Sequence, residues 1–464
     1  MRDFITRLPS SEHNYMNRII IIGNGFDKAH GLATGYRDFI DSYWTEFFGH
    51  IFGGYWRWIA QNYGVINDPS PYKDEFVQFD VARDKQYAES KLFHSQSHTE
   101  NPYGDVQEFI VTLNDKNNEN YKGSVCLTFK NKFFEHISKR CSLTNWVDIE
   151  NEYYRKLKAL LAEDNDVSRN KKVRELNRDF AAVKKKLESY LTAEIDKASM
   201  EPFPSIRGAF DSMVEPKEVA YGKQKLFVES ILSRMVVIGK DNERGDIIHV
   251  DKQDDPDYLF CRSEDEEKRH YVMKKLGDDR HKKTYCTPQD TLILNFNYTH
   301  TAEKLYARDK DIVINIHGEL NNDSNSIIFG YGDELDDGYT QIEKLQDNDF
   351  LENIKSVRYH ETSNYRKLLG FIESEPYQVI TMGHSCGNSD RTLLNTIFEH
   401  HNCISVKVYY HLREDGTDDY SQLIRNLSRN FNDKAAMRDK IVNKEQCSPL
   451  VPLSACEKKE TEQS

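Results

Sequence analysis

The chain has 464 residues, a formal charge of −13 and a hydrophobic content of 38%. This length is sufficient for two or three domains with buried cores, at roughly 150 residues each. The acidic balance argues against a dedicated nucleic-acid binder, which usually carries a basic surface. No apolar stretch approaches the ~18 residues that span a membrane, so we expect neither nucleic acid nor a membrane as a partner.

The cysteines and the N-terminal residues bear on where the protein resides. The eight cysteines are dispersed, and no two form a C-x-x-C pair. This pattern predicts unpaired thiols in a reducing compartment rather than a zinc ribbon. Residues 1–17 contain no apolar core of signal-peptide length. We therefore expect a cytoplasmic protein whose chemistry requires no metal.

The first predicted element is a buried strand at residues 18–22, an apolar run that leads into Gly23-Asn24-Gly25. Glycines after such a strand allow the backbone to approach a phosphate. The third glycine of the dinucleotide pattern is replaced by Lys28, so a plain strand-to-loop turn remains the alternative. Asp27 would repel a phosphate here, and we expect it to bind a ribose hydroxyl or to order the loop.

The middle of the chain is predicted to be mainly helical. A helix is expected from about Thr34 to residue 51, and two more at 146–161 and 174–195. The last two have apolar faces that should pair with each other or with a partner chain. The basic face of the last helix is interpreted as a solvated surface. Residues 239–288 are dense in charge and predict an exposed or mobile insertion.

Strand-like segments return at 291–296, 312–317, 326–330, 378–382 and 404–410. Polar residues follow three of them, namely Asn297, His317 and Gly383-His384-Ser385. Because ligands of parallel sheets bind beyond the carboxyl ends of the strands, these residues and the first glycine turn should line one crevice. We therefore predict an α/β fold with a Rossmann-like parallel sheet, split by a large and mainly helical insertion. The predicted parts are 1–51, the insertion 52–285, 286–445 and a disordered tail 446–464.

A competing interpretation comes from Gly383-His384-Ser385-Cys386-Gly387, which matches the G-x-S-x-G nucleophile elbow. A hydrolase of that type needs an acid and then a histidine downstream of the serine. Asp390 follows too soon, and the later histidines His400, His401 and His411 have no clear acidic partner. We therefore expect His384 and Ser385 to support the crevice rather than to attack a substrate.

The segment Gly23–Phe39, with the sequence GNGFDKAHGLATGYRDF, resembles the N-terminal signature of AbiH-type phage abortive-infection proteins. Further motifs of that family follow in the same order as in this chain. They are Phe296-Asn297-Tyr298-Thr299, Ile316-His317-Gly318-Glu319 and Gly383-His384-Ser385 through Asp390, and Trp146-Val147-Asp148-Ile149-Glu150 is also similar. The resemblance covers about residues 18–410.

The same order of motifs is similar to the sirtuin-like domains of bacterial defence proteins, several of which hydrolyse NAD. The resemblance implies that Asn297 and His317 are catalytic. Thr299 replaces an aspartate of that pattern and Asp27 replaces a small polar residue, which could alter the ribose contacts. The zinc-binding cysteines of deacetylase sirtuins are absent, which argues against deacetylation. The implied cofactor-binding residues are Gly23, Asn24, Gly25, Phe26, Asp27, Tyr36, Gly383, His384, Ser385 and Asp390.

The function implied by the resemblance is antiphage defence by abortive infection, through hydrolysis of NAD to nicotinamide and ADP-ribose. One alternative is a sensor that binds NAD or an ADP-ribose-type signal without cleaving it. Another is a nuclease toxin using His30, His317 or His384, against which the acidic charge counts. The expected ligand is NAD or a related nucleotide. Homo-oligomers and a partner protein from a defence system both remain open.

Overall fold

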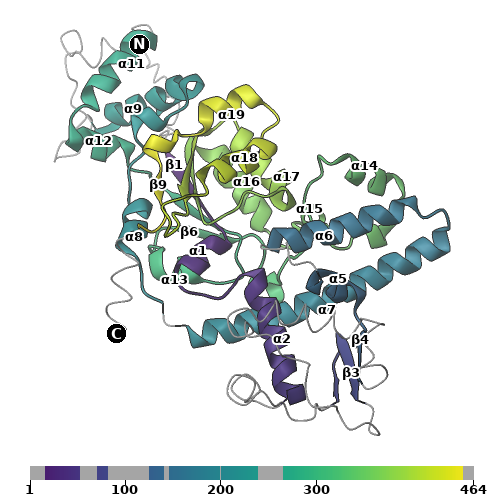
Figure 1. Cartoon of the computed structure of the whole chain (residues 1–464). Coiled ribbons are helices and arrows are strands. Elements are labelled where there is room, and N and C mark those ends of the chain that lie inside the picture. The colour runs from purple at the N-terminus through teal and green to yellow at the C-terminus, as the bar shows by residue number, and fades with distance from the viewer. Residues whose placement is uncertain are drawn as a thin grey trace, which may run out of the picture. The chain divides into compact units, whose positions relative to one another are not determined.

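The computed structural model describes residues 16–52, 71–81, 125–139, 146–198, 200–238 and 265–452. It divides into two compact units (Figure 1). The first, here called the sheet unit, comprises Met1–Gly31, Ser199–Ile328 and Arg358–Ser464. The second, the helical unit, comprises Leu32–Ala198 and Phe329–Val357. Each is described by itself.

The sheet unit is built on six parallel strands in the order β6-β5-β1-β7-β8-β9. The central strand β1 is fully buried, as expected for a parallel strand covered on both faces. The strands are β1 Asn17–Ile22, β5 Thr291–Asn295, β6 Ile312–Asn315, β7 Tyr377–Met382, β8 Cys403–Tyr410 and β9 Ser448–Pro449.

This strand order is that of the doubly wound nucleotide-binding sheet. Numbered along the chain, the strands lie in the order 3-2-1-4-5-6. The chain leaves β1 toward β5 and β6, and later returns to pair β7 with the other side of β1. The order therefore reverses between β1 and β7, where ligands of such sheets bind. The predicted α/β, Rossmann-like fold is confirmed at this level.

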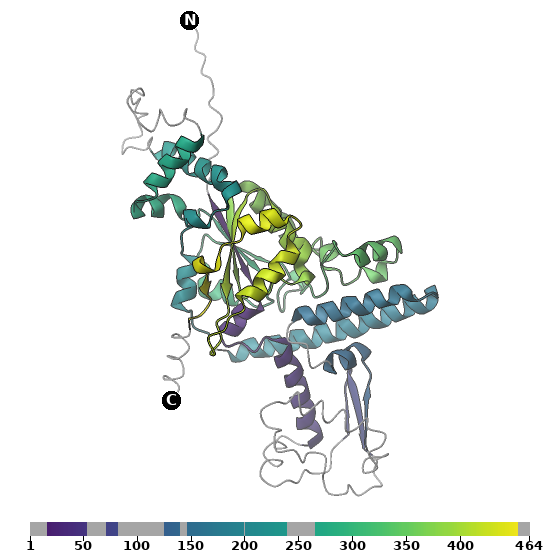
Figure 2. The same ribbon diagram turned by 45° about the horizontal axis from the view of Figure 1, so that its top comes forward.

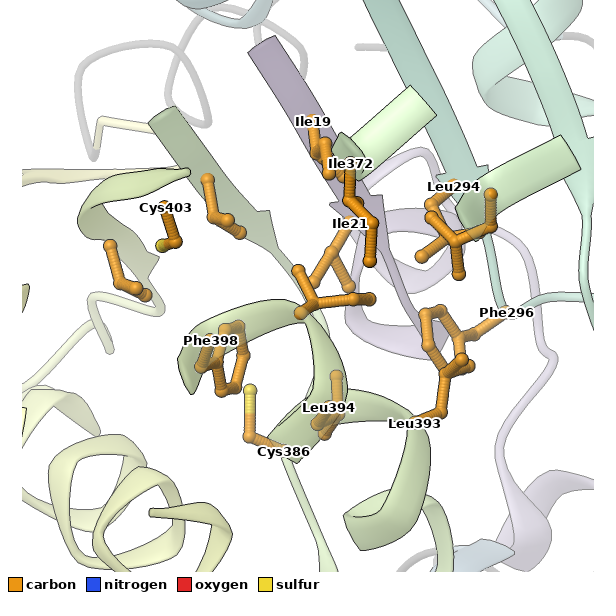
Figure 3. Packing of buried hydrophobic residues seen from close by; sticks show 14 of the residues in the cluster. Ile19, Ile21, Leu294, Phe296, Ile372, Cys386, Leu393, Leu394, Phe398 and Cys403 are labelled. Atoms are coloured by element: carbon orange, nitrogen blue, oxygen red, sulfur yellow. The ribbon is translucent and has the colours of Figure 1, made fainter. Parts of the chain in front are cut away.

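Alternate residues of β1 enter two different cores, because successive side chains of a strand point to opposite faces. Ile19 and Ile21 pack with residues of α16 (Asn364–Ser374), α17 (Arg391–Glu399) and α18 (Tyr420–Asn430), part of which Figure 3 shows. Ile20 and Ile22 pack with residues of α1 (Asn24–Ala29), α8 (Pro204–Phe210) and α13 (Thr301–Tyr306). The helices of this unit are α1 Asn24–Ala29, α8 Pro204–Phe210, α9 Gln224–Ile238, α11 Asp265–Lys275, α12 Asp279–Cys286, α13 Thr301–Tyr306, α16 Asn364–Ser374, α17 Arg391–Glu399, α18 Tyr420–Asn430 and α19 Lys434–Lys440.

Two local predictions differ in part from the structure. The charged stretch 239–288 includes α11 and α12, and Val272, Leu276 and Tyr285 of this stretch are buried in a core with α9. A few apolar residues are thus sufficient to pack these helices against α9. Residues 239–264 lie outside the described part of the chain. Residues 326–330 are irregular rather than a strand. The backbone N–H of Ile328 donates to the His317 carbonyl (2.7 Å), whereas Phe329 belongs to the helical unit and stacks there on Phe180.

The helical unit contains the long antiparallel pair α6 Trp146–Ala159 and α7 Asp166–Lys197, which run side by side (Figure 2). Tyr153 and Phe180 stack between them with ring centroids 4.2 Å apart. The expectation that these two helices pair with each other is thus confirmed. The other elements are α2 Tyr36–Phe52, α5 Lys132–Ser138, α14 Asp337–Lys344, the short α15 Lys355–Arg358, and an antiparallel sheet of β2 Tyr72–Lys73, β3 Val77–Val81 and β4 Val125–Phe129.

Glu150, in the motif that begins at Trp146, has a structural role inside the helical unit. Its carboxylate forms a buried ion pair with Lys355, at 2.8 Å and 3.0 Å, and accepts the N–H of Gly330 at 3.3 Å. Removing one partner of such a pair costs about 3–5 kcal/mol, because the other charge is left buried. Glu150 therefore fastens residues 329–357 to α6.

The two compact units have different boundaries from the parts that the sequence predicts. Residues 200–285 were predicted in the insertion but belong to the sheet unit, whereas 329–357 belongs to the helical unit. Ser448–Pro449, in the predicted tail, pairs with β8, and residues 453–464 lie outside the described part. The predicted boundaries stay a prediction. None of the described helices is long and apolar enough to cross a membrane.

Candidate functional site

The loops after β1 and β7 touch through glycines, an arrangement here called the glycine contact. The N–H of Gly25 donates to the Gly383 carbonyl at 2.8 Å. A Cβ on Gly23 would lie 2.4 Å from the Cα of His384, and one on Gly383 only 2.0 Å from the nitrogen of Phe26. Gly383 also has a φ of +68°, which favours glycine. These glycines are thus needed for the close approach of the two loops.

Asn297 follows β5 and is held against the first loop. Its Nδ2 donates to the Gly23 carbonyl at 3.0 Å, and its own N–H donates to Oδ1 of Asn295 at 3.1 Å. The Asn297 residue is only 8% exposed. The structure thus brings this predicted catalytic residue to the switch point between β1 and β7.

Asp27 lies in the same neighbourhood and is almost fully buried, at 1% exposed. The hydroxyl of Thr299 donates to its Oδ2 at 2.6 Å. Within the described residues, its Oδ1 has no hydrogen-bond partner. Burial raises the pKa of Asp27 to about 6, although hydrogen bonds such as that from Thr299 oppose the rise. An unpartnered carboxyl oxygen can accept a ligand hydroxyl, as predicted for this residue.

Three buried polar residues, His317, His384 and Asp390, form what we call the histidine–aspartate cluster. Nε2 of His317 lies 3.2 Å from Oδ1 of Asp390, and Nε2 of His384 lies 3.6 Å from Oδ2. The ring of Phe296 contacts both imidazoles, with centroids 4.9 Å and 4.4 Å apart. Since Phe296 precedes Asn297, these contacts bring the cluster and Asn297 into one region of the sheet unit.

Tyr359 is part of this region, and sequence reasoning missed it. Its hydroxyl lies 3.2 Å from Nε2 of His317, and the two rings are nearly parallel at 6.2 Å. It lies in none of the recognised motifs and follows the four-residue helix α15. Only the tertiary fold brings it to His317, so no local pattern could have revealed it.

The loop after β7 does not have the geometry of a nucleophile elbow. In that motif the serine itself sits on the strained turn. Here the positive φ values fall on Gly383 and on Cys386, at +51°, rather than on Ser385. The carbonyl of Ser385 accepts a hydrogen bond from Asn426 at 2.7 Å. This geometry supports the prediction that Ser385 is not a nucleophile, which still awaits a functional test.

Three other candidates lie in different settings. Phe26 is fully buried in the core on the α1 face, and Asn24 is half-buried at the first residue of α1. Tyr36 belongs to the helical unit, where its hydroxyl donates to the Ile137 carbonyl at 3.0 Å. Its predicted contact with a cofactor therefore stays a prediction.

His30, a candidate of the nuclease alternative, has a structural environment. Its Nδ1 lies 2.8 Å from the Phe26 carbonyl and its Nε2 lies 2.7 Å from the Tyr306 hydroxyl. Both ring nitrogens are thus engaged by the protein itself. A buried histidine with both nitrogens engaged in this way is poorly placed to act on a nucleic acid.

One histidine cluster in the described residues has the residue types of a metal site. Ligand atoms of Glu373, His400 and His401 lie within 4.8 Å of one another. However, Nδ1 of His400 accepts the N–H of Asn402 at 3.2 Å, which places the ring proton on Nε2. Nε2 faces Glu373 at 3.3 Å and cannot ligate a metal while it is protonated.

The basic face of α7 is largely neutralised within the helical unit. Arg174 pairs with Asp349 at 2.7 Å, and Lys186 pairs with Glu46 at 3.0 Å. Two hollows lie on this unit, one along α7 and one between α2 and α7. None of the predicted site residues lines either hollow. The charged face gives no support to a nucleic-acid surface.

Comparison with known proteins identifies the chain by family rather than by a single relative. No similar protein was found among curated sequences, and no similar structure among solved ones. Residues 19–411 match the family model described as bacteriophage abortive infection AbiH. This match includes all six of the loop residues in the glycine contact and the histidine–aspartate cluster. The chain therefore belongs to the AbiH family of bacteriophage abortive infection proteins.

Proposed function

We propose that this protein is an abortive-infection effector that hydrolyses NAD to nicotinamide and ADP-ribose. One observation carries the proposal. Asn297 and the histidine–aspartate cluster, from loops after β5, β6 and β7, gather beside the β1–β7 switch point. In doubly wound sheets this is where dinucleotides bind. Sirtuin-like chemistry remains an expectation from the order of the motifs.

The reaction matches the groups that this region offers. Water forms a bond to C1′ of the ribose while the bond from C1′ to the nicotinamide nitrogen breaks. The bonding electron pair leaves with nicotinamide, which becomes neutral, and the proton lost by water needs an acceptor. An imidazole, such as that of His317, can accept that proton. The Asn297 carboxamide can orient the water or a ribose hydroxyl.

Burial of the site fits an effector that is inactive until it is triggered. Asn297 is 8% exposed, His317 is 4% exposed and Asp390 is 4% exposed. We infer that a loop moves to admit NAD, because loop motions gate many enzymes. The closed arrangement would spare the NAD pool of an uninfected cell.

Nicotinamide release by purified protein tests the enzyme claim. We expect His317→Ala and Asn297→Ala to lower the rate by roughly 10²–10⁴-fold, as expected for lost acid–base or positioning groups. A suitable control is His411→Ala, because His411 lies beyond the end of β8 and is exposed. Equal rates for His317→Ala and the wild type would contradict the assigned role.

A sensor that binds without turnover is favoured by one observation. The polar groups at the switch point already bond to one another, as Asn297 does to Gly23 and Thr299 does to Asp27. A sensor would be stabilised by NAD or an ADP-ribose analogue through binding linkage, with no product formed. If the wild type, with its trigger and partners present, shows a raised melting temperature but no nicotinamide, the sensor replaces the enzyme.

A further inference from the structure

The carboxylate of Asp390 lies between two buried imidazoles and has both oxygens engaged. Oδ1 faces Nε2 of His317 at 3.2 Å, and Oδ2 faces Nε2 of His384 at 3.6 Å. The hydroxyl of Ser389 donates to Oδ2 at 3.4 Å. A carboxylate accepts hydrogen bonds and donates none, so His317, at 3.2 Å, must present an N–H group to it. The 3.6 Å contact with His384 is too long for a hydrogen bond. The Asp390 residue is therefore occupied by protein partners rather than directed at a ligand.

The tautomer of His384 follows from a second contact. The backbone N–H of Cys386 donates to its Nδ1 at 3.0 Å, so Nδ1 must carry the lone pair. The proton of the neutral ring is then on Nε2, the nitrogen that faces Asp390. The Cys386 contact thus fixes the tautomer of the neutral His384 ring, with its N–H on the side of the Asp390 carboxylate.

The tautomer of His317 depends on Asp390 more than that of His384 does. Its Nε2 also lies 3.2 Å from the Tyr359 hydroxyl, which can either donate or accept. The carboxylate removes this ambiguity, because it requires a proton on Nε2. The neutral ring then carries its lone pair on Nδ1, which is the nitrogen able to accept a proton.

We propose that Asp390 is a positioning residue that holds His317 in the Nε2–H tautomer, with Nδ1 as the proton acceptor. This replaces the cofactor contact that the resemblance implied for Asp390. The catalytic part of the inference rests on the proposed function. The tautomer itself does not, so it can be tested whether or not NAD is the substrate.

Histidine-selective ¹⁵N labelling and two-bond nitrogen–proton correlation spectra of the full chain measure the tautomers directly. Spectra of His317→Gln and His384→Gln assign the two signals. In the wild type we expect both rings as Nε2–H. In Asp390→Asn, the new amide can donate to Nε2 of His317, so we expect that ring to change to Nδ1–H while Cys386 keeps His384 unchanged. Asp433→Asn, at the exposed N-cap of α19, is the matched control and should change neither signal.

Kinetics provide the second measurement. We expect Asp390→Asn to lower kcat for nicotinamide release by roughly 10²–10⁴-fold with little change in KM. A raised KM with unchanged kcat would identify a ribose contact and overturn the positioning role. An Nδ1–H signal for His317 in the wild type would also overturn it, even if Asp390→Asn failed to fold. A wild type with Nε2–H at His317 and no nicotinamide release would uphold the positioning role and refute only the proposed enzyme.

Discussion

The glycine contact and the histidine–aspartate cluster lie at the same edge of one sheet but use their residues differently. In the glycine contact, Gly23, Gly25 and Gly383 serve the packing of one backbone on another, with hypothetical Cβ atoms 2.0–2.9 Å from neighbouring atoms. In the cluster, His317, His384 and Asp390 bring ionisable side chains together. The glycine pattern that suggested phosphate binding thus has a structural explanation, and the candidate chemistry lies in the cluster.

The largest expected effect tests the structural side of this comparison. We predict that Gly383→Ala destabilises the protein by at least about 3 kcal/mol, because a positive φ and an overlap with Phe26 are combined. The urea midpoint of unfolding measures this loss. Gly416→Ala is the control, since Gly416 has a φ of +79° but nothing within 4 Å of its hypothetical Cβ. That variant should lose only about 1 kcal/mol, and equal losses would refute close packing as the role of Gly383.

A second prediction concerns Asp27, an ionisable residue that is buried close to the glycine contact. The folded pKa is raised from 3.8 to about 6, so the folded state binds more protons than the unfolded state between these values. Stability therefore falls as the pH rises through this window, by up to about 3 kcal/mol relative to an Asp27→Asn variant without the titrating group. Thermal unfolding of both proteins from pH 4 to pH 7 measures the difference.

The control for Asp27 is Asp433, whose pKa is lowered by hydrogen bonds from the backbone N–H groups of Ala436 and Ala435. Its contribution has the opposite sign, because that stability is present at neutral pH and lost as the pH falls. That loss begins only as the pH falls to about 4, so the difference between Asp433→Asn and the wild type should stay nearly constant from pH 4 to pH 7. A constant difference between wild type and Asp27→Asn across the window would show that Asp27 is not buried as described.

The smallest expected effect concerns Ser385. We predict that Ser385→Ala changes stability by less than about 0.5 kcal/mol and leaves nicotinamide release unchanged, because the described contact of Ser385 uses its backbone carbonyl. Labelling with a serine-directed fluorophosphonate provides an independent check. Loss of an esterase activity in this variant, or labelling of Ser385, would show that Ser385 is a nucleophile and contradict this prediction.

The parts of the fold that could be predicted are those with strong local signals. The apolar runs that became β1, β5, β7 and β8 were each recognised, because a parallel strand buried on both faces needs continuous apolar residues. Residues 326–330 carry a similar apolar run, and Ile327, Ile328 and Phe329 are buried, but the run forms no strand of the sheet. Local composition does not distinguish a buried strand from a buried irregular segment, since both bury apolar side chains.

The candidate site could be predicted only in part, for a related reason. Asn297 and His317 were found because each follows a strand, and position beyond a strand end is a local property. The pairing of His317 with Asp390 and the contact with Tyr359 link segments that are distant along the chain. Their geometry depends on the tertiary fold, so the motif around Asp390 suggested a cofactor contact rather than a carboxylate shared by two histidines.

The most direct test of the account is the NAD content of phage-infected cells that produce this protein. We predict that NAD falls after infection while nicotinamide and ADP-ribose rise, and that phage yield drops. His317→Ala and Asn297→Ala, produced at equal levels, should abolish the fall in NAD and the protection together. Protection with an unchanged NAD pool in cells producing the wild type would contradict NAD hydrolysis by the cluster.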